Sequence, residues 1–178
     1  MELSTREPRY RRALRGALAG TVATGAMSVV QFAGAASAGK HPPPIEITRR
    51  LHRVLPTRAP RGGSLYLRGV ALHLAFGAIA GALYGFVAPR RFRELTSTAY
   101  AGLIYVASYR GYLAAFGLHP HAERDDTRRR AANVAGHLVY GLSLAEVMRW
   151  TDPPERADTD PRAEAALAGT EELVEADR

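Results

Sequence analysis

Residues 69–87 read GVALHLAFGAIAGALYGFV, a run in which His73 is the only strongly polar residue. The surface helix of a soluble bundle carries a polar stripe with a period of 3.6 residues, and this run has none. A helix of about 20 predominantly apolar residues is long enough to cross the hydrocarbon core of a bilayer, which is about 30 Å thick. The run therefore predicts a membrane-spanning helix.

Three further windows of the chain are almost free of charge. Residues 16–39 contain no charged residue, residues 95–118 contain only Arg110, and residues 131–148 contain only Glu146. Together with the first run, these windows predict four spans, at about 14–38, 68–88, 96–118 and 130–149. The predicted fold is all-α, an integral membrane four-helix bundle. A secretory signal peptide is the alternative for the first window, and we favour a retained span because its apolar run is long for a signal peptide.

The average composition of the chain does not show this separation of apolar and charged segments. A mean hydropathy of −0.16, 23% charged residues and a net charge of +7 are typical of a basic soluble protein. The charges, however, lie between the apolar windows and in the tail, where residues 151–178 carry nine acidic residues and three Arg. We therefore divide the chain into a basic N-terminal segment (1–12), a four-span membrane domain (13–150) and an acidic C-terminal tail (151–178).

The first loop predicts one short helix. Pro42, Pro43 and Pro44 interrupt the chain, and proline is favoured in the first turn of a helix. Ile47, Leu51, Val54 and Leu55 then share one face, opposite Arg49, Arg50 and Arg53. Such a helix either lies in the membrane interface with its apolar face down or caps the bundle.

The predicted spans contain glycines at a spacing of four residues. Gly16 and Gly20 form one such pair, and Gly77, Gly81 and Gly85 form two more. Small residues at this spacing let helix backbones approach closely in lipid. We expect these glycines, together with Gly141, to pack helices, either within the chain or in a homo-oligomer or larger membrane complex.

A short sequence is repeated in the second and fourth spans. Residues 73–77 read HLAFG and residues 137–141 read HLVYG, 64 positions apart. A duplicated two-span hairpin would explain the repeat, and chance similarity is the alternative. In four spans, His73 and His137 would lie toward the same membrane face, with Arg110 and the loop residue Glu46 toward that face as well.

These four residues are the candidate ligand or polar-path residues, because a His or Arg in a span is costly unless it is paired or lines a polar cavity. The two histidines could ligate a haem or a metal, or line a proton or substrate path. Arg110 could bind an anionic group. Alternatively, each histidine joins neighbouring helices through a hydrogen bond. No cofactor is the favoured prediction, with haem as the alternative.

The chain contains no motif of a hydrolase triad, a P-loop or a zinc protease. The absence of Cys excludes disulfides, thiolate metal sites and cysteine nucleophiles. We interpret Asp125 and Asp126, followed by Arg128–Arg130, as a solvated loop and the first turn of the fourth span. The sequence therefore predicts a non-enzymatic structural, accessory or partner-binding protein. The alternatives are a small transporter or channel-like module and a bis-His haem redox subunit.

The basic residues at the predicted membrane rims favour anionic lipid head groups as partners, rather than nucleic acid. They are almost evenly divided between the two sides, so the positive-inside rule barely distinguishes the orientations. We expect the cytoplasmic membrane, with both termini in the cytoplasm, because Arg9–Arg15 directly precede the first span.

Three motifs are similar to those of one protein group. They are the Gly-rich start of the first span (Gly16–Thr24), the element Pro43-Pro44-Ile45-Glu46, and the second-span pattern His73-x3-Gly77-x3-Gly81-x2-Tyr84-Gly85. Over about residues 13–149 the chain resembles small uncharacterised bacterial and archaeal membrane proteins, among them the YagU-like inner-membrane proteins. The resemblance implies a four-span integral membrane protein and no particular reaction.

Overall fold

The fold is all-α within the residues that the computed structural model describes, which are 7–55, 61–89, 92–118 and 125–152. This confirms the predicted fold class. The helical elements are α1 (Arg9–Ser37), α2 (Pro43–Val54), α3 (Gly63–Val87), α4 (Arg93–Tyr105), the π-helical segment η1 (Val106–Tyr112), α5 (Leu113–Ala115) and α6 (Thr127–Thr151). Most of the acidic tail, 153–178, lies outside the described residues, as does the start of the N-terminal segment, 1–6.

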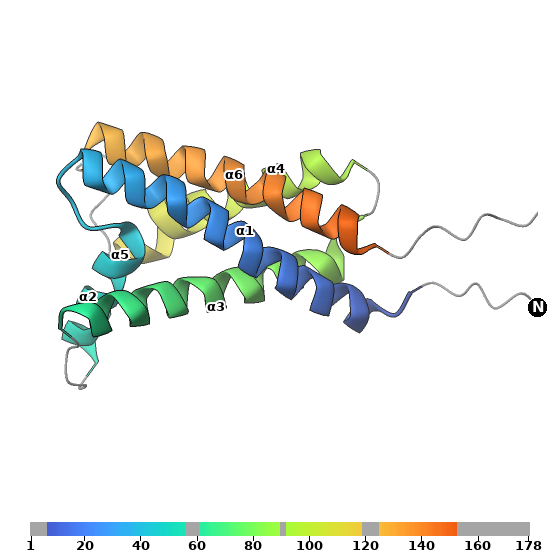
Figure 1. The fold of residues 1–178 in the computed structure, drawn as a ribbon, viewed down its shortest axis with the longest axis horizontal. Helices are drawn as coiled ribbons and strands as arrows, with labels where there is room; N and C mark the ends of the chain where they lie inside the picture. Colours follow the sequence, from blue (N-terminus) through green and yellow to red (C-terminus); the bar gives the residue numbers. More distant parts are fainter. Residues whose placement is uncertain (1–6, 56–60, 90–91, 119–124, 153–178) are drawn as a thin grey trace, which may run out of the picture.

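Helix α1 lies between α3 and α6 and packs along both, as Figure 1 shows, while α4 packs against α6. Gly16 and Gly20 of α1 face Gly81 and Gly77 of α3, so these two helices are antiparallel. The two halves of the chain, α1–α3 and α4–α6, each contain an antiparallel pair. The duplication of a two-span hairpin stays a prediction.

The molecule has two ends with different polar contacts. At the first, which we call the Asp152 end, Arg15 and Arg93 both form ion pairs with Asp152. At the second, the Glu46 end, Glu46 and Asp125 form ion pairs with Arg129. The first described helix, α1, begins at the Asp152 end and the last, α6, ends there (Figure 1).

Two of the described helices, α1 and α3, are long and apolar enough to cross a membrane. Helix α4 ends after 13 residues, and α6 contains Glu146 and has basic residues near both ends. The prediction of membrane-crossing helices is therefore supported for the first two spans, and the four-span arrangement stays a prediction.

The third predicted span, 96–118, is not one regular helix. Regular α-helix ends at Tyr105, and the π-helical segment η1 contains Gly111 at φ −100° and ψ −112°. Glycine tolerates this non-helical backbone because it has no Cβ. Within the segment, the hydroxyl of Ser108 donates to the carbonyl of Ile104 at 2.6 Å, and such bonds compete with regular helix geometry.

Helix α2 packs onto the start of α3. Ile45 is completely buried, and Gly69 of α3 leaves room for it because a Cβ on Gly69 would lie 2.7 Å from the Ile45 side chain. Thr48 is also buried, whereas Ile47 and Leu51 are only partly covered. The first turn of α2 is therefore its main contact with α3, and both alternatives for this helix stay predictions.

Candidate functional site

The Glu46 end contains a buried network of ion pairs that joins α2 to α6. Nη1 of Arg129 lies 2.7 Å from a Glu46 oxygen, and Nε of Arg129 lies 2.8 Å from an Asp125 oxygen. Arg50 pairs with the other oxygen of Glu46 at 2.6 Å. Arg129 also donates to the backbone carbonyl of His41 at 3.2 Å. The guanidinium of Arg129 is 3% exposed, so these partners replace the water it has lost.

The charges of this network are balanced. Two carboxylates, Glu46 and Asp125, face two guanidinium groups, Arg50 and Arg129. Burial alone would raise the pKa of Glu46, but the hydrogen bonds and positive charges of Arg129 and Arg50 outweigh it, so the pKa lies below its ordinary value. Glu46 is therefore ionised at neutral pH and holds α2 in place.

The arginines lie in the first turn of α6, as expected, but the interpretation of Asp125 as part of a solvated loop is wrong. The side chains of Asp125 and Arg129 are almost fully buried, and the hydroxyl of Tyr109 in η1 donates to the Asp125 carboxylate. Asp126 is exposed and caps α6, accepting hydrogen bonds from the backbone amides of Arg128 and Arg129 at 2.9 and 3.3 Å. The network thus connects α2, η1 and α6.

A second polar cluster lies deeper, between α1 and α6. Nε2 of Gln31 donates to Oδ1 of Asn133 at 2.7 Å, and Nδ1 of His137 donates to the carbonyl of Asn133 at 2.8 Å. The ring of Tyr105 packs edge-on against His137 with centroids 5.2 Å apart. Oε1 of Gln31 is buried with no hydrogen-bond partner among the described residues, although a buried amide normally has one.

His73 lies one turn before Gly77 of α3, whose carbonyl accepts a hydrogen bond from Tyr140 of α6, and Nε2 of His73 is also buried without a hydrogen-bond partner among the described residues. The bond from Nδ1 of His137 to Asn133 leaves its Nε2 free to accept a proton or to ligate a metal. The pair thus supplies the donor type of a bis-His haem, while Tyr105 covers one side of His137. The haem hypothesis stays a prediction.

The four candidate polar residues do not form one site. His73 and His137 lie near the same contact of α3 with α6, but Glu46 belongs to the separate ion-pair network. Arg110 is exposed, and among the described residues it has no ion-pair partner. Its guanidinium therefore contributes nothing to either cluster in the described part of the chain.

The candidate packing glycines lie at two helix contacts. Five of them form the contact of α1 with α3, which we call the glycine interface: Gly16, Gly20, Gly77, Gly81 and Gly85. Each would bring an added Cβ into overlap with atoms of the opposite helix. Gly141 lies elsewhere, on α6, where a Cβ would lie 2.7 Å from Cα of Thr98 on α4.

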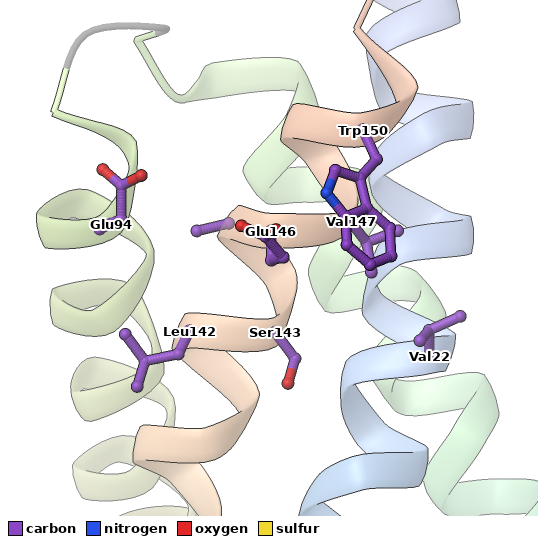
Figure 2. Close-up of a pocket in the computed structure, with 8 residues that line it drawn as sticks. Val22, Glu94, Leu142, Ser143, Glu146, Val147 and Trp150 are labelled. Carbon is purple, nitrogen blue, oxygen red and sulfur yellow. The ribbon is translucent and has the colours of Figure 1, made fainter.

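Two grooves lie along α6, one near each end. Figure 2 shows the groove near the Asp152 end, about 480 Å³, where Glu94 of α4 and Glu146 and Trp150 of α6 line mostly apolar walls. The groove near the Glu46 end is about 640 Å³, and α6 supplies all of its lining except Tyr105 of α4. Arg130 is its charged residue.

Neither the network nor the deeper cluster was predicted, although the sequence contains a signal for both. Arg129, Asn133, His137 and Tyr140 recur at three- and four-residue spacing and occupy the buried face of α6. The same face of α6 continues to Leu144 and Met148. Because these two apolar residues are expected to be buried, the polar residues Arg129, Asn133 and His137 on the same face are expected to be buried too. Asp125 lies four residues before Arg129 and pairs with it.

A scan against protein-family models, a search of curated proteins and a search of solved structures each gave no match for this chain. The resemblance to the YagU-like group therefore stays a prediction that rests on its three motifs.

Proposed function

We propose that this chain is a four-span protein of the cytoplasmic membrane with a non-enzymatic role, as a structural or accessory component that binds a partner within the membrane. We also propose that it belongs with the YagU-like small membrane proteins. Both termini would lie in the cytoplasm and the Glu46 end on the opposite side.

The apolar outer surface supports this proposal. Large apolar side chains are exposed on every long helix, among them Leu18, Val22, Val29, Leu72, Phe76, Ile79, Leu83, Leu95, Leu103, Val134, Leu138 and Leu142. No charged residue lies in 16–37, 69–87, 95–109 or 131–145, so the charges of the helices are confined to the two ends. A soluble monomer rarely exposes so much contiguous apolar surface, whereas a bilayer would cover it.

The glycine interface also supports a membrane location. Lipid gives little hydrophobic driving force for helix association, so helices in membranes rely on close backbone contact between small residues. The glycines themselves form the contact, because an added Cβ on Gly16, Gly20 or Gly81 would lie within about 2.1 Å of a backbone oxygen of the opposite helix.

Cysteine labelling tests the membrane proposal without a background signal, because the chain has no Cys. Three exposed positions sample the molecule: Arg9 near the Asp152 end, Ser64 near the Glu46 end and Ile79 between them, where the side chain is 70% exposed. Each single-cysteine variant is expressed in bacteria and treated with a membrane-impermeant maleimide, before and after lysis.

We expect Ser64→Cys to react in intact spheroplasts, Arg9→Cys to react only after lysis, and Ile79→Cys to react in neither. Rapid labelling of Ile79→Cys in lysed cells without detergent would overturn the membrane proposal. Labelling of Arg9→Cys but not Ser64→Cys in intact spheroplasts would reverse the orientation.

A small transporter is the second candidate, because Gln31, Asn133, His73 and His137 place polar groups inside the bundle and two of their atoms lack partners among the described residues. Polar groups at membrane depth are typical of ion and proton paths. Purified protein in proteoliposomes containing a pH-sensitive dye tests this. Proton flux above that of empty vesicles, lost in His73→Ala, would favour transport over the accessory role.

A further inference from the structure

The two grooves along α6 differ in their charge. Both have mainly apolar walls, but the groove near the Asp152 end contains the carboxylates of Glu94 and Glu146. The groove near the Glu46 end contains Arg130 and no acidic residue among its described lining. Arg130 has no acidic partner within the described residues, whereas Arg149 at the opposite end pairs with Glu146 at 2.5 Å.

The described acidic residues at the Glu46 end already have partners. Asp125 pairs with Arg129, and Asp126 accepts the first backbone amides of α6. Glu46 pairs with Arg50 and Arg129. The positive charge of Arg130 is therefore not neutralised by the described carboxylates at this end.

The polar residues of this groove lie at one end of it, and the apolar residues follow along α6. Thr127 and Arg130 lie in its first turn, followed by Ala131, Val134 and Leu138. Leu138 is eight residues beyond Arg130, about 12 Å along the helix at 1.5 Å per residue. A hydroxyl and a guanidinium at one end of an open apolar groove match a phosphate joined to an acyl chain.

We propose that this groove, formed by α6 and Tyr105, binds one anionic phospholipid, with its phosphate at Arg130 and an acyl chain along Val134 and Leu138. The proposal rests on the membrane location proposed above. The groove at the Asp152 end serves as an internal comparison, because its described lining contains Glu94 and Glu146 and no basic residue.

The single tryptophan of the chain makes the comparison measurable. Trp150 lines the groove at the Asp152 end, so its fluorescence reports on lipids there (Figure 2). The double variant Trp150→Phe, Leu138→Trp moves the indole into the other groove, at a position that is 50% exposed. Both full-length proteins are reconstituted with brominated phosphatidylglycerol or brominated phosphatidylcholine, and the quenching by each lipid gives its relative association constant.

We expect the indole introduced at position 138 to prefer the anionic lipid about fivefold, the effect of one basic residue near an anionic lipid. The indole of Trp150 is expected to show no preference for it. Arg130→Gln, made in the double variant, should reduce the preference to about one. Arg128→Gln is the matched control, because Arg128 is exposed on the same helical turn and does not line the groove. It should leave the preference unchanged.

Equal quenching by both lipids at position 138 would overturn the lipid site while leaving the membrane location intact. A preference that survives Arg130→Gln, or that Arg128→Gln abolishes equally, would also overturn it, because the attraction would then belong to the whole surface. Quenching at Trp150 but none at position 138 would show that a second copy or another segment covers the groove. Absence of quenching at both positions by either lipid would instead contradict the membrane proposal.

Discussion

Gly20 of α1 and Gly81 of α3 lie in backbone contact, so that a Cβ atom on Gly20 would lie 2.8 Å from Cα of Gly81. The same Cβ would overlap the carbonyl oxygen of Gly77. Neither neighbour is a flexible side chain, so only a separation of the two helices could relieve the overlap.

The substitution Gly20→Ala should therefore destabilise the protein by about 1–3 kcal/mol, the usual cost of overpacking a tight contact. Gly25→Ala is the control on the same helix, because a Cβ there meets no atom within 4 Å. Thermal unfolding in detergent, followed by circular dichroism, measures both. An equal melting temperature for the two variants would contradict a tight α1–α3 contact.

The substitution Glu46→Gln should destabilise the protein by about 3 kcal/mol at neutral pH, because it removes one charged partner of the buried Arg129 guanidinium. Its effect depends on pH. The pKa of Glu46 is lower in the folded protein, so its stabilisation is complete above the unfolded pKa of about 4.3. It is lost as the pH falls through the lower folded value.

Wild type and Glu46→Gln should therefore differ in unfolding midpoint at pH 7 and converge toward pH 3. Glu146→Gln is the control, because Glu146 forms an exposed pair with Arg149 at the opposite end. A difference between wild type and Glu46→Gln that is independent of pH would refute the ion-pair explanation.

Tyr109→Phe should lower the stability by about 1–2 kcal/mol, since it removes a hydrogen bond from a phenol to the buried Asp125 carboxylate. Tyr112→Phe changes the same chemical group in the same segment, at a side chain that is 40% exposed. Chemical denaturation compares the two. Equal losses would mean that the hydroxyl of Tyr109 has no special role in holding η1.

We expect purified protein, expressed with ample haem, to show no Soret band, and His137→Ala to lower the thermal stability by about 2 kcal/mol. The ring of His137 packs against Tyr105 and donates a hydrogen bond to the carbonyl of Asn133. Its removal therefore leaves a cavity beside Tyr105 and removes that hydrogen bond. A Soret band that disappears in His73→Ala would instead establish haem binding by the pair.

Helix positions were the most predictable part of the fold. Runs of uncharged residues predicted spans at about 14–38 and 68–88, and the corresponding helices are Arg9–Ser37 and Gly63–Val87. The break in the third span was missed, because a single Gly111 in an apolar run does not distinguish a kinked helix from a straight one. The broken segment also makes a tertiary contact, from Tyr109 to Asp125, that the sequence of the span does not reveal.

The candidate site was less predictable, because charge partners depend on which helices meet. Glu46 was a candidate for a polar path with the histidines, but α2 folds back on α3 and places it beside Arg129. Residues 128–130 are three consecutive arginines with three environments, exposed, buried and half-buried. Their different exposure depends on which face of α6 packs against the neighbouring helices. The run of three arginines does not by itself show which face that is.

The position of α1 between α3 and α6 also has a consequence for biosynthesis. The chain emerges from the ribosome starting at its N-terminus, so α1 and α3 can pair as soon as α3 has been synthesised. Helix α4 comes next, but its main contact among the described helices is α6, which is made after it. We therefore expect α4 to remain without its principal partner until α6 has been synthesised, a stage at which a chaperone or insertase would find it accessible.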